Sequence, residues 1–170
     1  MPINLKLYVP LGIILLKEII YGTADICHSE IEDCTLPWTF GEDSVDYVHM
    51  RWLMGSIVDW DALFAEAFKT LKPGGWVESY EARMQVDCDH MEIPADAYIQ
   101  QWSKFFLDGG EKLGRTFYVW ERELQRKGME KAGFVDIQEV DLKASVKSPP
   151  DTLLLGRNGA LELIFIYRDH

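Results

Sequence analysis

Residues 45–78, VDYVHMRWLMGSIVDWDALFAEAFKTLKPGGWVE, decide the fold. The stretch opens with a short apolar strand at 45–48. The following helix has Asp59 as a plausible N-cap and should bury one face against a sheet, with Leu63, Phe64, Ala67 and Phe68 at its centre and Trp60 and Leu71 at its ends. The run KPGG at 72–75 stops this helix because proline cannot continue it, and a second strand follows at 76–80. A strand, an amphipathic helix and a strand predict a βαβ unit.

The same rhythm continues toward the carboxyl end. A helix is expected over about residues 96–107, ended by Gly109 and Gly110, with these residues on its buried face: Tyr98, Ile99, Trp102, Phe105 and Phe106. A third helix is expected over about 120–132, ending at Gly133. Residues 135–142 alternate as a strand, with a bulge or an early end because Ile137 and Val140 are out of phase. Residues 161–167 are the final strand candidate. The fold class is therefore α/β.

Composition excludes several classes of protein. The 170 residues suit one globular domain, and 17 Lys and Arg against 28 Asp and Glu give a net charge of −11, which disfavours nucleic acid as a partner. Cys27, Cys34 and Cys88 match neither a disulfide framework nor a zinc pattern, so we expect reduced thiols, no metal, and an intracellular location, cytoplasmic or nuclear. The apolar run at 7–16 is too short to span a membrane; a signal peptide is the alternative interpretation of it.

Three stretches carry a resemblance: EIEDCTLPWTF at 30–40, VDYVHMR at 45–51 and LKPGGWVE at 71–78. At this spacing they resemble class I S-adenosylmethionine (SAM) methyltransferases, and more narrowly the fungal LaeA-like methyltransferases associated with secondary metabolism. The resemblance implies a partial Rossmann-like fold with three layers, a mostly parallel sheet and an antiparallel final strand. It covers residues 29–146, between a divergent amino-terminal segment, 1–28, and a divergent tail, 147–170.

The resemblance also implies site residues. Asp33 would accept a hydrogen bond from the adenine amino group of SAM, and the backbone of Cys34 would donate one to the ring. His49, Met50 and Arg51 would face the methionine part of SAM and the pocket of the methyl acceptor, which is a small molecule or a protein side chain. We expect Asp33, His49, Arg51 and Glu78 on one rim, at the carboxyl ends of the strands. His49 is a candidate general base, or a structural residue, since no carboxylate partner is identifiable.

The glycine-rich turn that such a site needs after its first strand is missing, and so is an acidic residue for the ribose. Residues 2–7 resemble the family strand that leads into the Asp-Cys loop, but residues 8–29 then intervene. We interpret this insert as translated non-coding sequence or a splice variant, with the start codon inside the domain. The chain alone should then bind SAM weakly or not at all.

The strand at 45–48 would also lack one neighbour. Either residues 13–20 fold back onto its edge, or the chain aggregates or self-associates through that edge. Three functions stay open: a methyltransferase, truncated and incomplete; a non-catalytic remnant that acts as an interaction module; and a small secreted protein.

Overall fold

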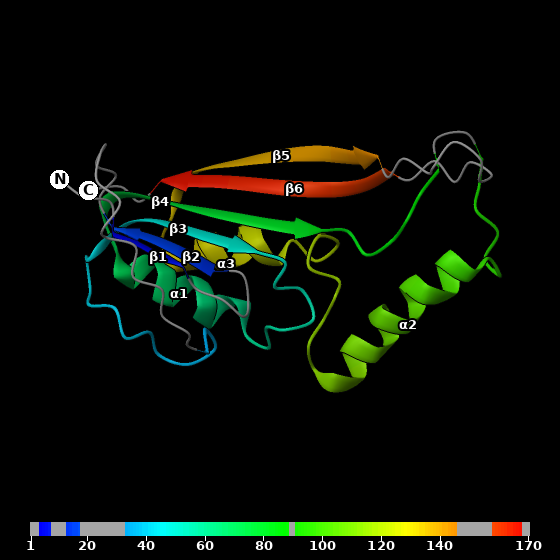
Figure 1. Cartoon of the computed structure of the whole chain (residues 1–170), viewed down its shortest axis with the longest axis horizontal. Coiled ribbons are helices and arrows are strands. Elements are labelled where there is room, and N and C mark those ends of the chain that lie inside the picture. Colours follow the sequence, from blue (N-terminus) through cyan, green and yellow to red (C-terminus); the bar gives the residue numbers. More distant parts are fainter. Residues whose placement is uncertain (1–3, 8–12, 18–32, 89–90, 146–157, 168–170) are drawn as a thin grey trace.

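The computed structural model describes residues 4–7, 13–17, 33–88, 91–145 and 158–167, which form one six-stranded sheet with helices (Figure 1). The strand order is β1-β2-β3-β4-β6-β5. The elements are β1 (Asn4–Leu7), β2 (Ile13–Lys17), β3 (Val45–Arg51), α1 (Trp60–Thr70), β4 (Leu71–Ala82), α2 (Tyr98–Leu113), α3 (Leu124–Ala132), β5 (Val135–Ser145) and β6 (Asn158–Tyr167).

The β3–α1–β4 unit forms as the sequence predicts. The Asp59 side chain caps α1 by accepting from the Ala62 N–H at 2.9 Å. Leu63, Phe64 and Ala67 are buried, and Phe68 is partly buried against the edge of Phe134. The strand β4 starts at Leu71, directly after the helix, and the KPGG run forms an irregularity within it: Val45 pairs with Leu71 but Tyr47 already pairs with Trp76. The predicted core of this unit is thus confirmed.

The carboxyl-terminal strands also match their predictions. β6 is antiparallel to both β4 and β5, between which it lies. β5 carries the predicted irregularity, a register shift between Val135 and Gln138. The third helix begins at Leu124 rather than near residue 120, because Glu123 adopts a left-handed conformation with φ 54° that no helix can contain.

The prediction for α2 was wrong in two respects. Gly109 and Gly110 do not end the helix, which continues to a left-handed C-cap at Gly114 with φ 67°. The predicted buried face is largely in solvent, since Tyr98 is 90% and Phe105 73% exposed. The side that packs on the protein is formed by Ser103, Leu107 and Gly110. A Cβ on Gly110 would approach the Phe117 ring to 2.6 Å, so the absent side chain allows this close contact.

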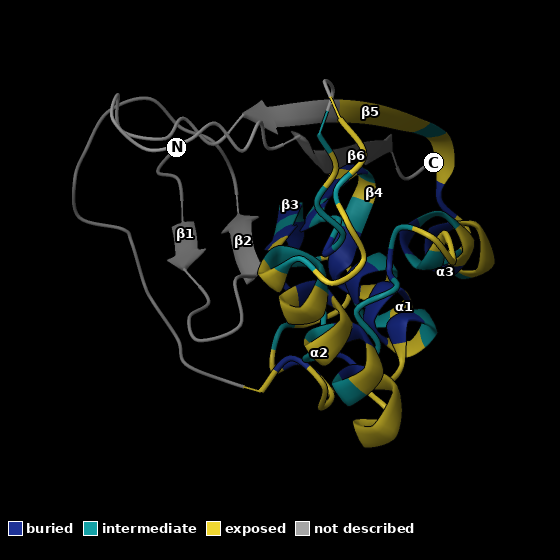
Figure 2. Ribbon diagram, turned by 90° about the vertical axis from the view of Figure 1, so that its right-hand side faces the viewer, coloured by how far each residue is buried: buried dark blue, intermediate teal, exposed yellow. Residues whose placement is uncertain are grey.

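The sheet differs from the expected mostly parallel arrangement. Among the described strands, β1, β3, β4 and β5 run one way and β2 and β6 the other, but β3 and β4 form the one parallel pair of neighbours. The physical reason is that a hairpin of β1 and β2, not a βα unit, precedes β3, and β6 separates β4 from β5. Viewed from the carboxyl ends of β3 and β4, α1 and α3 lie together on one face of the sheet (Figure 2). These helices form one of the two helical layers that the resemblance implied.

The free edge of β3 is covered by β2, which is one of the two outcomes expected from the sequence. β2 pairs with β3 in antiparallel register, Ile13 with Met50 and Leu16 with Tyr47. The segment predicted to fold back, residues 13–20, thus does so over residues 13–17. No helix of the described part of the chain is long and apolar enough to cross a membrane.

Candidate functional site

The carboxyl halves of β3 and β4 bring polar side chains together. In their parallel register His49 pairs with Glu78 and Arg51 with Tyr80. Side chains alternate along β3, so Val48 and Met50 are fully buried on the side of the helices, whereas Tyr47, His49 and Arg51 point to the opposite face. This opposite face carries the chemistry of the two strands.

Glu78 is the centre of a small hydrogen-bonded cluster, Tyr47–Glu78–His49. Its Oε2 lies 2.6 Å from His49 Nδ1 and also accepts a hydrogen bond from the Tyr47 hydroxyl. The His49 and Glu78 side chains are 20% and 12% exposed. Burial raises the pKa of Tyr47 well above its usual range, and the bond to Glu78 adds to the shift. Tyr47 therefore donates to the carboxylate and is not itself a base.

This geometry corrects one statement drawn from the sequence. Glu78 is the carboxylate that orients His49, a partner that was not identified in the sequence. Pairing on Nδ1 leaves Nε2 of the ring available as a proton acceptor. The cluster thus has the parts of a positioned base, and also those of a purely structural network. The pair could have been found from the parallel register of the two strands, which places His49 of β3 beside Glu78 of β4.

Arg51 extends the same face toward the strand ends. Its guanidinium lies 5.3 Å from the centroid of the Tyr80 ring, a cation–π distance, and the side chain is exposed. Tyr80 follows Glu78 on the same side of β4. His49 and Arg51 therefore lie two residues apart on the same face of β3, near its carboxyl end.

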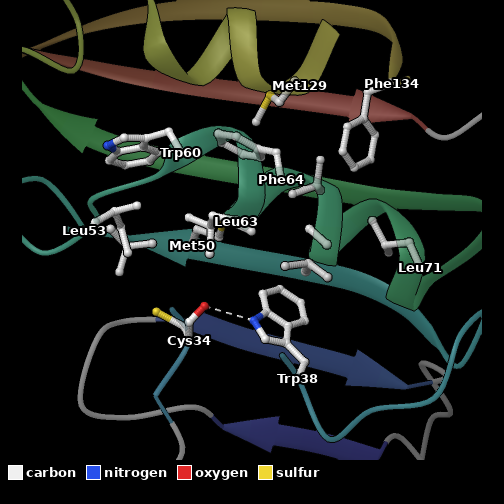
Figure 3. Packing of buried hydrophobic residues seen from close by; sticks show 14 of the residues in the cluster. Cys34, Trp38, Met50, Leu53, Trp60, Leu63, Phe64, Leu71, Met129 and Phe134 are labelled. Carbon is white, nitrogen blue, oxygen red and sulfur yellow. Dashed lines mark hydrogen bonds between the residues drawn. The ribbon is translucent and has the colours of Figure 1, made fainter. Parts of the chain in front are cut away.

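The loop that carries Asp33 and Cys34 packs on the other side of β3. Cys34 is 2% exposed and belongs to the same core cluster as Met50, and its carbonyl accepts from Trp38 Nε1 at 3.1 Å (Figure 3). Burial raises the pKa of the Cys34 thiol to about 11, so it stays protonated. A cavity of about 480 Å³ lies between this loop and α1, lined by Cys34, Thr35 and Leu63 among others. Neither His49 nor Arg51 lines it.

Asp33 has local partners at the exposed start of this loop. Its Oδ1 accepts from the Thr35 hydroxyl at 2.7 Å and from the Thr35 N–H at 2.9 Å, and these bonds hold its pKa below the usual value. The rim of Asp33, His49, Arg51 and Glu78 expected from the sequence stays a prediction. Met50 faces the helices together with Cys34, whereas His49, Arg51 and Glu78 face away from them. The reason is the alternation of β3, which sends neighbouring residues to opposite faces.

A second carboxylate was missed in the sequence. Glu81 is 1% exposed and accepts backbone hydrogen bonds from Leu53 at 2.7 Å and Met54 at 3.0 Å, so it fixes the loop that leaves β3. Burial raises its pKa to about 7, although both backbone bonds act in the opposite direction. No pattern in the sequence indicates that Glu81 is buried, because its partners are the backbone N–H groups of Leu53 and Met54 in the loop after β3.

Comparison with known proteins decides the family. The family model described as a methyltransferase domain matches residues 21–139, well over half of the chain. The chain belongs to this methyltransferase-domain family. One relative is the secondary metabolism regulator LAE1 of Cochliobolus heterostrophus, which is 34% identical to this chain over 120 residues. That match covers 70% of this chain and 38% of the relative. The secondary metabolism regulator laeA of Fusarium oxysporum is 38% identical over 104 residues, which cover 59% of this chain and 33% of that protein. The chain thus spans about a third of the length of these relatives.

Solved structures agree on the fold. A SAM-dependent methyltransferase from Thermotoga maritima matches with a TM-score of 0.52 and 14% identity, over 85% of this chain and 65% of that one. Phosphoethanolamine N-methyltransferase 2 of Haemonchus contortus, in complex with SAM, matches with a TM-score of 0.54 and 16% identity, over 84% of this chain and 37% of that one. The methyltransferase-domain chain therefore has a Rossmann-like α/β methyltransferase fold.

Proposed function

We propose that this chain forms the acceptor-side half of a SAM-dependent methyltransferase domain and acts in the regulation of secondary metabolism, as its relatives' names state of them. The observation that carries the proposal is the parallel β3–β4 pair, whose carboxyl ends hold His49, Arg51 and Glu78 on one face. In open α/β sheets ligands bind at this edge. The methyl acceptor is a small molecule or a protein side chain that reaches this face.

SAM does not fit the described residues in the way the family pattern requires. That pattern needs a glycine-rich turn at the carboxyl edge, after a strand that runs parallel to β3. Here the neighbour of β3 is β2, which is antiparallel, so the chain leaves β2 at the opposite edge, near Val45. Asp33, the candidate for the adenine contact, already accepts two hydrogen bonds through one oxygen. We therefore propose weak or no SAM binding by the isolated chain.

The same pairing favours a second candidate function, that of a non-catalytic interaction module. The hairpin of β1 and β2 closes the edge at which a cofactor-bearing strand would pair, which suits a stable module more than an open half-site. We further propose an intracellular location, cytoplasmic or nuclear, which the free thiols of Cys34 and Cys88 support. The net charge of −11 supports a partner other than nucleic acid.

Calorimetric titration of the purified chain with SAM tests the cofactor proposal. Losing two or three buried hydrogen bonds to charged groups, each worth roughly 1.5–3 kcal/mol, moves a micromolar Kd to the millimolar range or weaker, since about 1.4 kcal/mol is tenfold. The Haemonchus contortus enzyme, which is known in complex with SAM, serves as the positive control in the same buffer. A micromolar Kd for the chain alone would show that its amino-terminal segment builds a cofactor site.

A further inference from the structure

Helix α2 has an inner side that packs on the protein and an outer aromatic side that is largely exposed in the described part of the chain. Its inner side, formed by Ser103, Leu107 and Gly110, faces the protein. The outer side exposes Tyr98 at 90%, Trp102 at 49% and Phe105 at 73%. Surface helices normally carry polar residues on the side away from the core. The exposed aromatic residues of α2 therefore indicate a contact beyond the residues that the structure describes.

The spacing of the outer side identifies the kind of contact. Tyr98, Trp102, Phe105 and Gly109 follow one another at intervals of four, three and four residues, the spacing of a seam between two packed helices. We call these four residues the α2 seam. Two rings of the seam pack on Phe106, a neighbour of the seam: the centroid of Trp102 lies 4.8 Å and that of Phe105 5.5 Å from the centroid of the Phe106 ring. A partner helix would thus meet a preformed surface.

We propose that the α2 seam binds the α2 seam of a second copy of this chain, with the two helices antiparallel about a two-fold axis near Phe105. In this arrangement the larger side chains of one seam lie opposite the smaller residues of the other. Trp102 of one copy then lies opposite Gly109 of the second copy, and Tyr98 lies opposite Leu113, which is 76% exposed. A Cβ added to Gly109 would meet nothing within 4 Å, so this position is open and bears no side chain that would keep an indole ring away from the helix.

Charge complementarity supports the same pairing. Lys104 and Asp108 flank the seam, both are exposed, and the described residues give neither of them an ion-pair partner. About the proposed axis Lys104 of one copy lies within one residue, about 1.5 Å along the helix, of the level of Asp108 of the second copy, and the reverse pair forms by symmetry. A membrane surface is a poorer occupant, because anionic lipid would repel a chain of net charge −11. An interface of one helix pair is small, so we expect a micromolar dimer.

Sedimentation equilibrium over a wide range of chain concentration tests the proposal, with Gly109→Leu as the main variant. This substitution places a bulky side chain where Trp102 of the second copy would lie, yet it has open space in the monomer and favours the helix. We expect the wild type to dimerise and Gly109→Leu to weaken dimerisation at least about tenfold, which corresponds to about 1.4 kcal/mol. Leu36→Ala, at an exposed leucine outside α2, is the matched control and should leave the Kd unchanged.

A charge exchange tests the orientation of the helices. Lys104→Glu and Asp108→Lys should each weaken the dimer, because each places like charges opposite one another, and the double variant should restore it. A wild type that stays monomeric at every concentration overturns the proposal. So does a dimer that Gly109→Leu leaves unchanged, which would point to a different surface such as a sheet edge. A double variant no tighter than the single ones contradicts the antiparallel arrangement.

Discussion

At the residue scale, Glu78 links the two strands whose ends form the candidate site. It accepts from Tyr47 and pairs with His49 while only 12% of its side chain is exposed. A carboxylate in this position is a hydrogen-bond acceptor only, so the His49 ring should carry its hydrogen on Nδ1. The orientation of His49, and hence the use of Nε2 as a base, depends on this one side chain.

Glu78→Gln should change the tautomer of His49. The amide can donate to Nδ1, which raises the share of the Nε2–H form, and the weaker pairing should lower the free energy of unfolding by about 1–2 kcal/mol. The nitrogen chemical shifts of the imidazole report the tautomer, and urea unfolding reports the stability. Tyr47→Phe is the control, because it keeps the carboxylate and should keep the Nδ1–H form. An unchanged tautomer in Glu78→Gln would mean that Glu78 does not orient His49.

Glu81 should make stability depend on pH. Its folded pKa of about 7 lies above the unfolded value of 4.5, so the folded state binds the extra proton between these values. The free energy of unfolding therefore contains a contribution from the protonated Glu81 that is fully present below pH 4.5 and is lost as pH rises through 7. The full shift in pKa corresponds to a loss of about 3 kcal/mol. We expect Glu81→Gln to remove this decrease. Urea unfolding of both proteins from pH 4.5 to 8 measures it, and parallel curves would contradict the assignment.

At the element scale, the contact between α1 and α3 depends on one glycine. A Cβ at Gly128 of α3 would lie 2.6 Å from Cδ2 of the fully buried Phe64 and 3.3 Å from the Trp60 carbonyl. Such distances require a shift of α3 or of the Phe64 ring. Glycine is therefore retained inside a helix whose propensity would favour alanine.

Gly128→Ala should destabilise the fold. The strain of overpacking costs typically about 1–3 kcal/mol, which exceeds the gain in helix propensity of about 1 kcal/mol. Gly109→Ala is the matched variant: it lies in a helix with nothing within 4 Å and should stabilise the fold by about 0.5–1 kcal/mol. Urea unfolding of both variants at low chain concentration gives the two values. Gains of equal size would show that α3 is not tightly packed on α1.

Elements with strong local signals could be predicted from the sequence. The end of α1 was placed within one residue because proline and glycine follow it at once, and the β5 bulge followed from two out-of-phase residues. The buried side of α2 could not be predicted, because its aromatic residues formed the clearer apolar stripe while a glycine made the contact. Glu78 and Glu81 were not recognised as anchors, because their partners depend on the register of β3 and β4 and on the path of a loop.

At the scale of the whole molecule, the direction of β2 relates the fold to the function. The strands from β3 to β6 follow the methyltransferase arrangement, with an antiparallel final strand between β4 and β5. At the other end of the sheet an antiparallel hairpin occupies the edge of β3. A strand in this direction completes the hydrogen bonding of β3, but its carboxyl end lies at the wrong edge for a cofactor turn.

Cross-strand nuclear Overhauser effects between residues 13–16 and 47–50 distinguish an antiparallel β2 from a parallel one. We predict close Hα–Hα contacts in antiparallel order, running from Ile13 with Met50 to Leu16 with Tyr47. Contacts whose numbers rise together on both strands would mean a parallel strand beside β3. The carboxyl end of that strand would then lie next to His49 and Arg51, where a cofactor turn belongs, and the account would be wrong.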